Sequence, residues 1–107
     1  MLLSVQAFKS GDVVVVKLVT GEEIITKLVE PDVTSYSISR PLVFTMHPQT
    51  GQPALIPWLM SLNPKDPKPV VINKSAVVGM TTPAKEIADS YTQATTGIVT
   101  APAGFVL

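Results

Sequence analysis

Side chains able to do acid–base or metal chemistry are few in this chain. His47 is the single histidine and cysteine is absent, so one chain cannot build a histidine- or thiolate-based metal site. Glu22 and Glu23 are adjacent, but they fall at the tip of a predicted hairpin, where no cleft allows an acid–base pair. The glycines are scattered and form no phosphate-binding loop. We therefore expect no enzyme, no metal and no cofactor, with His47 a solvated turn residue beside Pro48.

Composition indicates a single small domain, residues 1–107, with more apolar surface than it can bury. The chain has 107 residues, of which 46% are hydrophobic and only 15% charged, and the formal net charge is zero. A domain of this size cannot hide so much apolar surface alone, which favours a protein partner. Zero net charge argues against strong non-specific binding to duplex nucleic acid. We expect no signal peptide, because Gln6 and Lys9 interrupt the apolar N-terminus and no basic region precedes it. We expect no membrane span, because no apolar stretch approaches about 18 residues.

The first half of the chain predicts a β-hairpin. Val13 to Val16 is a run of four β-branched residues, which pack well on a sheet and lose rotamer freedom in a helix. The turn Thr20-Gly21-Glu22 follows, with glycine supplying an unusual backbone dihedral. Residues Glu23 to Glu30 form the second predicted strand.

Three further strand regions follow the hairpin. Ser35 to His47 predicts a third strand with an edge or bend at Pro41, because proline cannot donate to a ladder. Gln52 to Leu62 predicts a fourth strand. Val70 to Met80 predicts a last strand pair, broken at Asn73-Lys74-Ser75.

One helix is expected, over Pro83 to Thr95. Thr82 is the predicted cap, Pro83 the first helical residue and Gly97 the residue past the end. A thin apolar stripe at helical spacing suits it to lie on a sheet: Ala84, Ile87, Ala88, Tyr91 and Ala94. We expect the uncharged tail, residues 98–107, either to be disordered or to add to a neighbouring subunit.

Two segments resemble the motifs of the Sm-like (Sm/LSm) ring family. The stretch from Val16 to Asp32 resembles the first motif: a strand, a hairpin glycine, a second strand and an aspartate that opens a binding loop. The matching positions are Val16, Leu18, Gly21, Ile24, Leu28 and Asp32. The stretch from Val71 to Val77 resembles the second motif, although Asn73-Lys74 stands where the family usually has Arg-Gly, and Thr26 replaces a usual glycine of the first motif. The whole chain looks most like the short Sm-like proteins of tailed phages of marine bacteria (the cyanophage type).

The resemblance implies a fold and an assembly. The fold would be mainly β: a small, strongly bent, five-stranded Sm-like (SH3-like) barrel with one C-terminal helix, the first motif covering about 13–36 and the second about 70–80. Barrels of this kind would join edge to edge into a closed homo-oligomeric ring of roughly five to seven subunits. The expected location is the cytoplasm of a bacterium or of a phage-infected host cell.

The implied function is binding of single-stranded nucleic acid, RNA first or DNA, with a role in RNA or DNA processing. The expected contacts lie on the loops facing the ring pore: Asp32, Thr34, Tyr36, Asn73 and Lys74. Three of these residues also have a purely structural interpretation: Asp32 can start a turn, Lys74 can be solvated, and Tyr36, like Trp58, can be a packing residue. The alternative function is a structural or adaptor ring that binds protein partners, which zero net charge and the altered motif residues favour.

Overall fold

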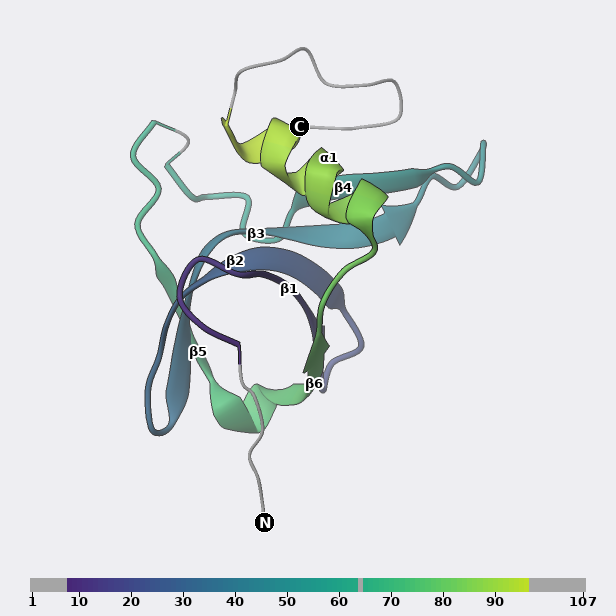
Figure 1. Cartoon of the computed structure of the whole chain (residues 1–107). Coiled ribbons are helices and arrows are strands. Elements are labelled where there is room, and N and C mark those ends of the chain that lie inside the picture. Colours follow the sequence, from purple (N-terminus) through teal and green to yellow (C-terminus); the bar gives the residue numbers. More distant parts are fainter. Residues whose placement is uncertain (1–7, 64, 97–107) are drawn as a thin grey trace.

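The computed structural model describes residues 8–63 and 65–96, which form a mainly β domain with one C-terminal helix (Figure 1). The six strands, the short 3-10 helix η1 and the helix α1 follow one another in the order β1 Val13–Leu18, β2 Glu23–Pro31, β3 Ser35–Met46, β4 Pro53–Pro57, β5 Val70–Asn73, η1 Lys74–Ala76, β6 Val77–Thr81 and α1 Lys85–Thr96. The hairpin of β1 and β2 is confirmed, and its turn residue Gly21 has φ +106°, a conformation that side chains disfavour.

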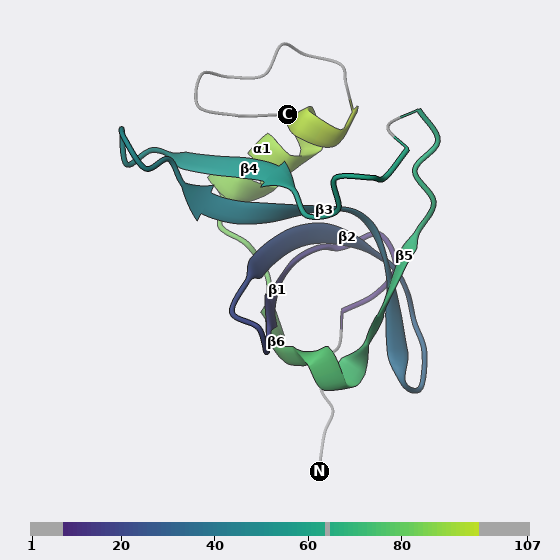
Figure 2. The ribbon, with the colours of Figure 1, turned by 180° about the vertical axis from the view of Figure 1, so that it is seen from behind.

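All strand pairs are antiparallel, and the sheet curls on itself without closing. The order is β4-β3-β2-β1-β6, with β5 also paired to β3. Figure 2 shows β5 and β6 at the two margins of the curl, joined through η1.

The strand regions predicted from local patterns are all present, but the six-stranded sheet that they form is not the closed five-stranded barrel that the resemblance implies. The difference arises because β3 serves two different partners. Residues Ser35–Ile38 pair with β5, whereas Leu42–Met46 pair with β4. Between the two halves Arg40 has φ +50°, and Pro41 follows it. The predicted bend at Pro41 is therefore present, and it lets β4 form a sixth strand beyond the curl.

The four-valine run of β1 is buried from two sides. Val14 and Val16 are fully buried inside the curl, in the cluster with Ile24, Leu28 and Ile38. The alternate residues Val13 and Val15 pack on the opposite face, beside the cluster of Ile25, Leu42, Leu55 and Tyr91. A strand covered on both faces needs a continuous apolar run, which is what this segment supplies.

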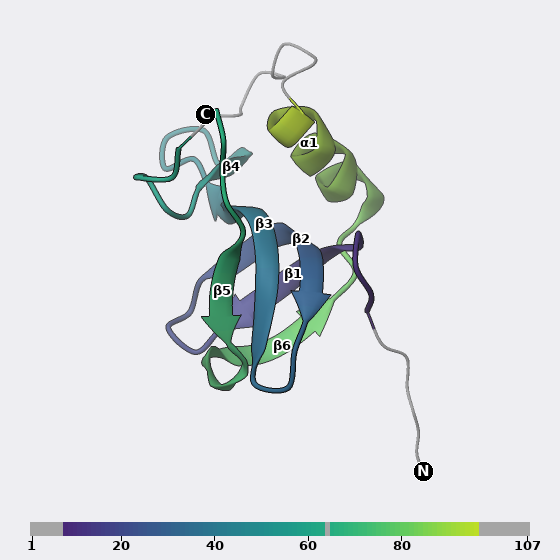
Figure 3. The same cartoon turned by 90° about the vertical axis from the view of Figure 1, so that its left-hand side faces the viewer.

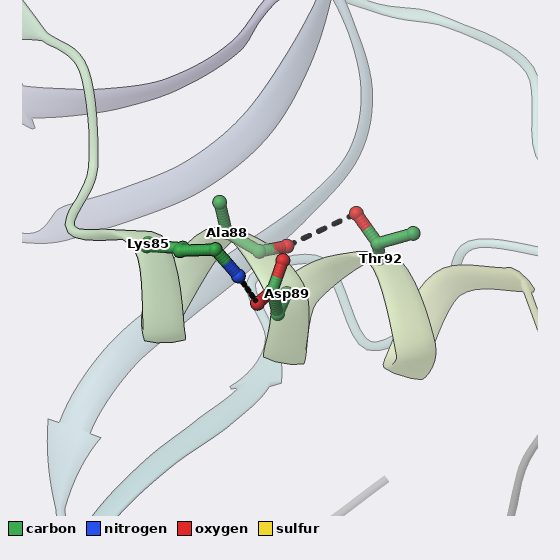
Figure 4. Close-up of polar contacts among 4 residues, drawn as sticks. All are labelled: Lys85, Ala88, Asp89 and Thr92. Carbon is green, nitrogen blue, oxygen red and sulfur yellow. Dashed lines mark hydrogen bonds and ion pairs between the residues drawn. The ribbon is translucent and has the colours of Figure 1, made fainter.

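The helix α1 covers the second cluster, and Figure 1 shows it lying across β3 and β4. Tyr91 is its one buried residue, with Ile87 and Ala94 packed beside it. The opposite face is polar: Lys85 Nζ lies 2.8 Å from Asp89 Oδ2, and the Thr92 hydroxyl donates to the Ala88 carbonyl at 3.0 Å (Figure 4). The ion pair with Asp89 raises the pKa of Lys85.

Tyr91 also enters the hydrogen-bond ladder between β2 and β3. Lys27 and Ser39 are register partners, yet the Lys27 N–H donates to Tyr91 Oη at 3.2 Å, and the Tyr91 hydroxyl donates to the Ser39 carbonyl at 2.6 Å. The Thr26 hydroxyl donates to the same carbonyl at 2.7 Å. The register shifts here, between Ile25 and Lys27. The two hydroxyls satisfy polar groups that the irregular ladder would leave unpaired.

Several predicted boundaries move. The fourth strand ends at Pro57 and not at Leu62: the Trp58 N–H still bonds to the Pro41 carbonyl, and a turn over Leu59–Leu62 then leads the chain away. The third strand ends at Met46, one residue before His47.

The helix begins at Lys85 and not at Pro83. The Ala88 N–H donates to the Ala84 carbonyl at 3.0 Å, which makes Ala84 the residue that flanks the helix. Thr82 therefore lies outside the helix and does not cap it. Gly97 and the tail 98–107 lie outside the described residues.

Candidate nucleic-acid interface

Two connections that lie far apart in sequence meet at one end of the curl. The turn from β2 to β3 and the start of η1 lie side by side, at the bottom of Figure 3. Ser35 pairs with Asn73 and Tyr36 with Ile72, and the Lys74 N–H donates to the Thr34 carbonyl at 2.9 Å. The five residues predicted as contacts are therefore brought together. We call Asp32, Thr34, Tyr36, Asn73 and Lys74 the loop-end cluster.

Lys74 and Tyr36 form the centre of this cluster. The Lys74 ammonium lies over the Tyr36 ring, 4.9 Å from its centroid, which is cation–π geometry. Both residues are half-buried, and Tyr36 also packs against the core cluster inside the curl. A positive charge is thus held against an aromatic ring at the edge of the core.

Asp32 and Asn73 use their side chains to shape the two connections. Asp32 Oδ1 accepts from the Val33 N–H at 2.8 Å, and the Asp32 N–H donates to the Ser35 carbonyl at 2.8 Å, which closes the turn. Asn73 Oδ1 accepts from the Ser75 N–H at 2.9 Å and caps η1. These bonds show that Asp32 starts a turn. The side chains of Asp32 and Asn73 are both exposed.

One exposed apolar side chain, Val33, lies beside the loop-end cluster and was not among the predicted site residues. Thr34 is exposed, and its neighbour Val33, at the tip of the same turn, is 85% exposed. The sequence signal was available, because a valine between Asp32 and Thr34 in a turn has no core within reach. The surface around the cluster is therefore mixed, with polar groups and one apolar tip.

The other residues considered for chemistry occupy structural positions elsewhere. His47 Nδ1 accepts from the Gln49 N–H at 3.2 Å within the β3–β4 turn. Trp58 packs against the core inside the curl, as predicted, and its Nε1–H donates to Glu22 Oε2 at 3.4 Å. The hydroxyl of Thr20, with a smaller contribution from Trp58, lowers the pKa of Glu22.

No residue of the loop-end cluster forms an ion pair within the described residues. The ion pairs found in residues 8–63 and 65–96 are Lys68–Asp66 and Lys85–Asp89, and neither includes a residue of the cluster. The same residues hold no group of three or more His, Cys, Asp or Glu side chains that could ligate a metal ion. Within the described part of the chain, α1 is too short and too polar to cross a bilayer.

No known family model matches the chain, and no curated protein matches it. Function is therefore inferred from the geometry of the loop-end cluster.

Proposed function

We propose that this protein is an Sm-like ring subunit that binds single-stranded nucleic acid, RNA first, at the loop-end cluster. The observation that carries the proposal is the Lys74 ammonium held 4.9 Å from the Tyr36 ring, on connections that also bring Asp32, Thr34 and Asn73 together. An aromatic ring and a cation in contact with it are the two groups that bind a base and its phosphate.

The order of the strands supports the Sm-like part of the proposal. Five strands follow one continuous curled path, β6-β1-β2-β3-β5, whose two margins are joined by η1. This path resembles the bent five-strand barrel that the motifs imply, with β4 as an addition on the far half of β3. The buried Thr26, in place of the usual glycine, lies at the shift in register where β2 bends.

The free strand edges favour assembly through β5 and β6. In β4 the even residues face β3, because the Trp58 N–H and the Gln52 carbonyl both bond toward it. The free edge of β4 therefore presents Pro53, Leu55 and Pro57, of which only Leu55 has an N–H, so it is a poor template for pairing. Strands β5 and β6 contain no proline and carry Val71 and Val78, 66% and 67% exposed.

The ring would be homo-oligomeric, with roughly five to seven subunits. We expect light scattering to return five to seven times the 11.4 kDa of one chain at micromolar concentration. Val78→Lys should reduce this mass to that of a monomer, because a charge would enter the paired edge. Met46→Lys is the control, since Met46 is 55% exposed on β3 near the β3–β4 turn. A monomeric parent protein would contradict the ring.

Binding is tested by fluorescence anisotropy with short U-rich, A-rich and mixed RNA and with single-stranded DNA, each at two salt concentrations. The proposal predicts measurable affinity for RNA that falls as salt rises, because phosphate contacts release counterions.

A second function, an adaptor ring that binds protein, has its own supporting observation. Val33 is 85% exposed at the tip of the turn within the cluster, and the net charge of the chain is zero. This alternative predicts no affinity for any of the four oligonucleotides near physiological salt.

A further inference from the structure

A separate apolar groove lies at the other end of the molecule from the loop-end cluster. Its volume is about 600 Å³, which is the size of a typical ligand cleft. One wall is the segment after β4, with Leu59, Met60 and Leu62, and the other is the last turn of α1, Ala94–Thr96. Arg40 and Pro41 of the β3 bend complete the lining.

The groove exposes large apolar side chains to solvent. Met60 is 82% and Leu59 36% exposed, and both side chains belong to its lining. Large exposed apolar side chains that gather in a concave site mark a surface that another segment covers.

The C-terminal tail, residues 97–107, starts at the wall of this groove, because Thr96 lines it. Its eleven residues carry no charge and include Ile98, Val99, Phe105, Val106 and Leu107. An extended chain of that length reaches about 36 Å, longer than the 30 Å middle dimension of the molecule.

Two features at the end of α1 favour the tail as the occupant of the groove. Gly97 follows the last helical residue, and glycine in that position permits the chain to reverse over the final turn of its own helix. The Arg40 guanidinium donates to the Thr95 carbonyl, which places a cation at the C-terminal end of α1, whose own last turn has no basic residue. This contact fixes the end of the helix where it borders the groove.

We propose that the tail after Gly97 folds back in its own subunit and fills this groove against Leu59, Met60 and Leu62. A tethered segment competes at millimolar effective concentration, which favours it over the tail of a second copy or an apolar segment of another protein. The uncharged composition of the tail matches the groove and needs no nucleic acid, so this inference is independent of the proposed function.

Methionine oxidation by dilute peroxide tests whether the tail covers Met60. Met60 should oxidise several-fold faster in a chain that ends at Gly97 than in the full chain, because the tail no longer shields its thioether. Met46, 55% exposed and outside the groove, is the internal control and should oxidise equally in both chains. Equal Met60 rates in the two chains would overturn the proposal.

Disulfide trapping in the full-length chain identifies the occupant and does not depend on whether the shortened chain folds. The protein has no cysteine, so Met60→Cys paired with Phe105→Cys, or with Val99→Cys, gives an unambiguous product. We expect at least one pair to form a bridge within one chain. The control pair, Met46→Cys with Phe105→Cys, should form none. Bridges only between chains, or no bridge from either Met60 pair, would overturn the proposal.

Discussion

The two tyrosines of the chain have opposite surroundings. Tyr91 is 1% exposed, and its hydroxyl makes two hydrogen bonds inside the β2–β3 ladder. Tyr36 is half-buried at the end of the curl, where its ring meets the Lys74 ammonium. The first joins the helix to the sheet, whereas the second borders solvent beside a positive charge. Residue type alone therefore does not assign a role, and hydrogen-bond partners and burial do.

The largest expected effect is on stability, from Tyr91→Ala. Removing a buried aromatic side chain from the cluster under α1 should lower the free energy of unfolding by about 3–5 kcal/mol, measured by urea denaturation. Thr92→Ala, an exposed change one residue along the same helix, is the control and should cost far less. Similar losses in both variants would mean that Tyr91 does not anchor the helix.

The second effect is alkaline unfolding. Burial raises the pKa of Tyr91 from 10.0 to about 12, so the folded state favours the neutral phenol. The resulting stability is fully present below pH 10 and is lost as the pH rises through about 12. Its size is about 2–3 kcal/mol.

Tyr91→Phe should lack this part of the pH dependence while retaining the ring. The comparison is a pair of urea denaturation series from pH 9 to the highest pH at which the proteins stay soluble. Since the two proteins differ only in the Tyr91 hydroxyl, the difference between the two series isolates that group. Parallel stability curves would contradict the buried hydroxyl.

A smaller effect concerns the partner of Tyr36. Lys74→Ala should weaken RNA binding and reduce the slope of log affinity against log salt by about 0.7 for each phosphate that the lysine no longer neutralises. Lys65→Ala removes an exposed charge from the segment before β5 and serves as the control in the same anisotropy titration. An unchanged salt slope in Lys74→Ala would show that Lys74 meets no phosphate.

Much of the fold follows from local patterns. The valine run, Gly21 and the alternation that follows it predict the β1–β2 hairpin, because a strand covered on both faces and a positive-φ turn leave clear local signals. The helix was predicted two residues early, since Thr82 and Pro83 satisfy the usual starting pattern without entering the helix.

What the sequence did not predict depends on tertiary contacts. The apolar stripe that contains Tyr91 was predicted, but the hydrogen bonds of its hydroxyl were not. Their partners, Lys27 and Ser39, are 64 and 52 residues from Tyr91 in the sequence and come together only in the folded sheet. Likewise, Arg40 in a left-handed conformation has no local signature, so the division of β3 between β4 and β5 was not predicted.

The sequence predicted which residues form the candidate site, but not how their side chains contact one another. Motif resemblance selected Asp32, Thr34, Tyr36, Asn73 and Lys74, and the structure brings them together. The Lys74–Tyr36 contact could not be predicted, because it needs the pairing of β3 with β5.

The most direct test is the affinity of Tyr36→Ala and Tyr36→Phe for the tightest-binding RNA, with melting curves recorded beside it. A lost stack costs about 1–3 kcal/mol per base, so Tyr36→Ala should bind roughly 5- to 150-fold more weakly with an unchanged salt slope, whereas Tyr36→Phe should bind like the parent. Parent-like affinity in the folded Tyr36→Ala protein, or no affinity in the parent protein for any oligonucleotide, would contradict nucleic-acid binding at this cluster.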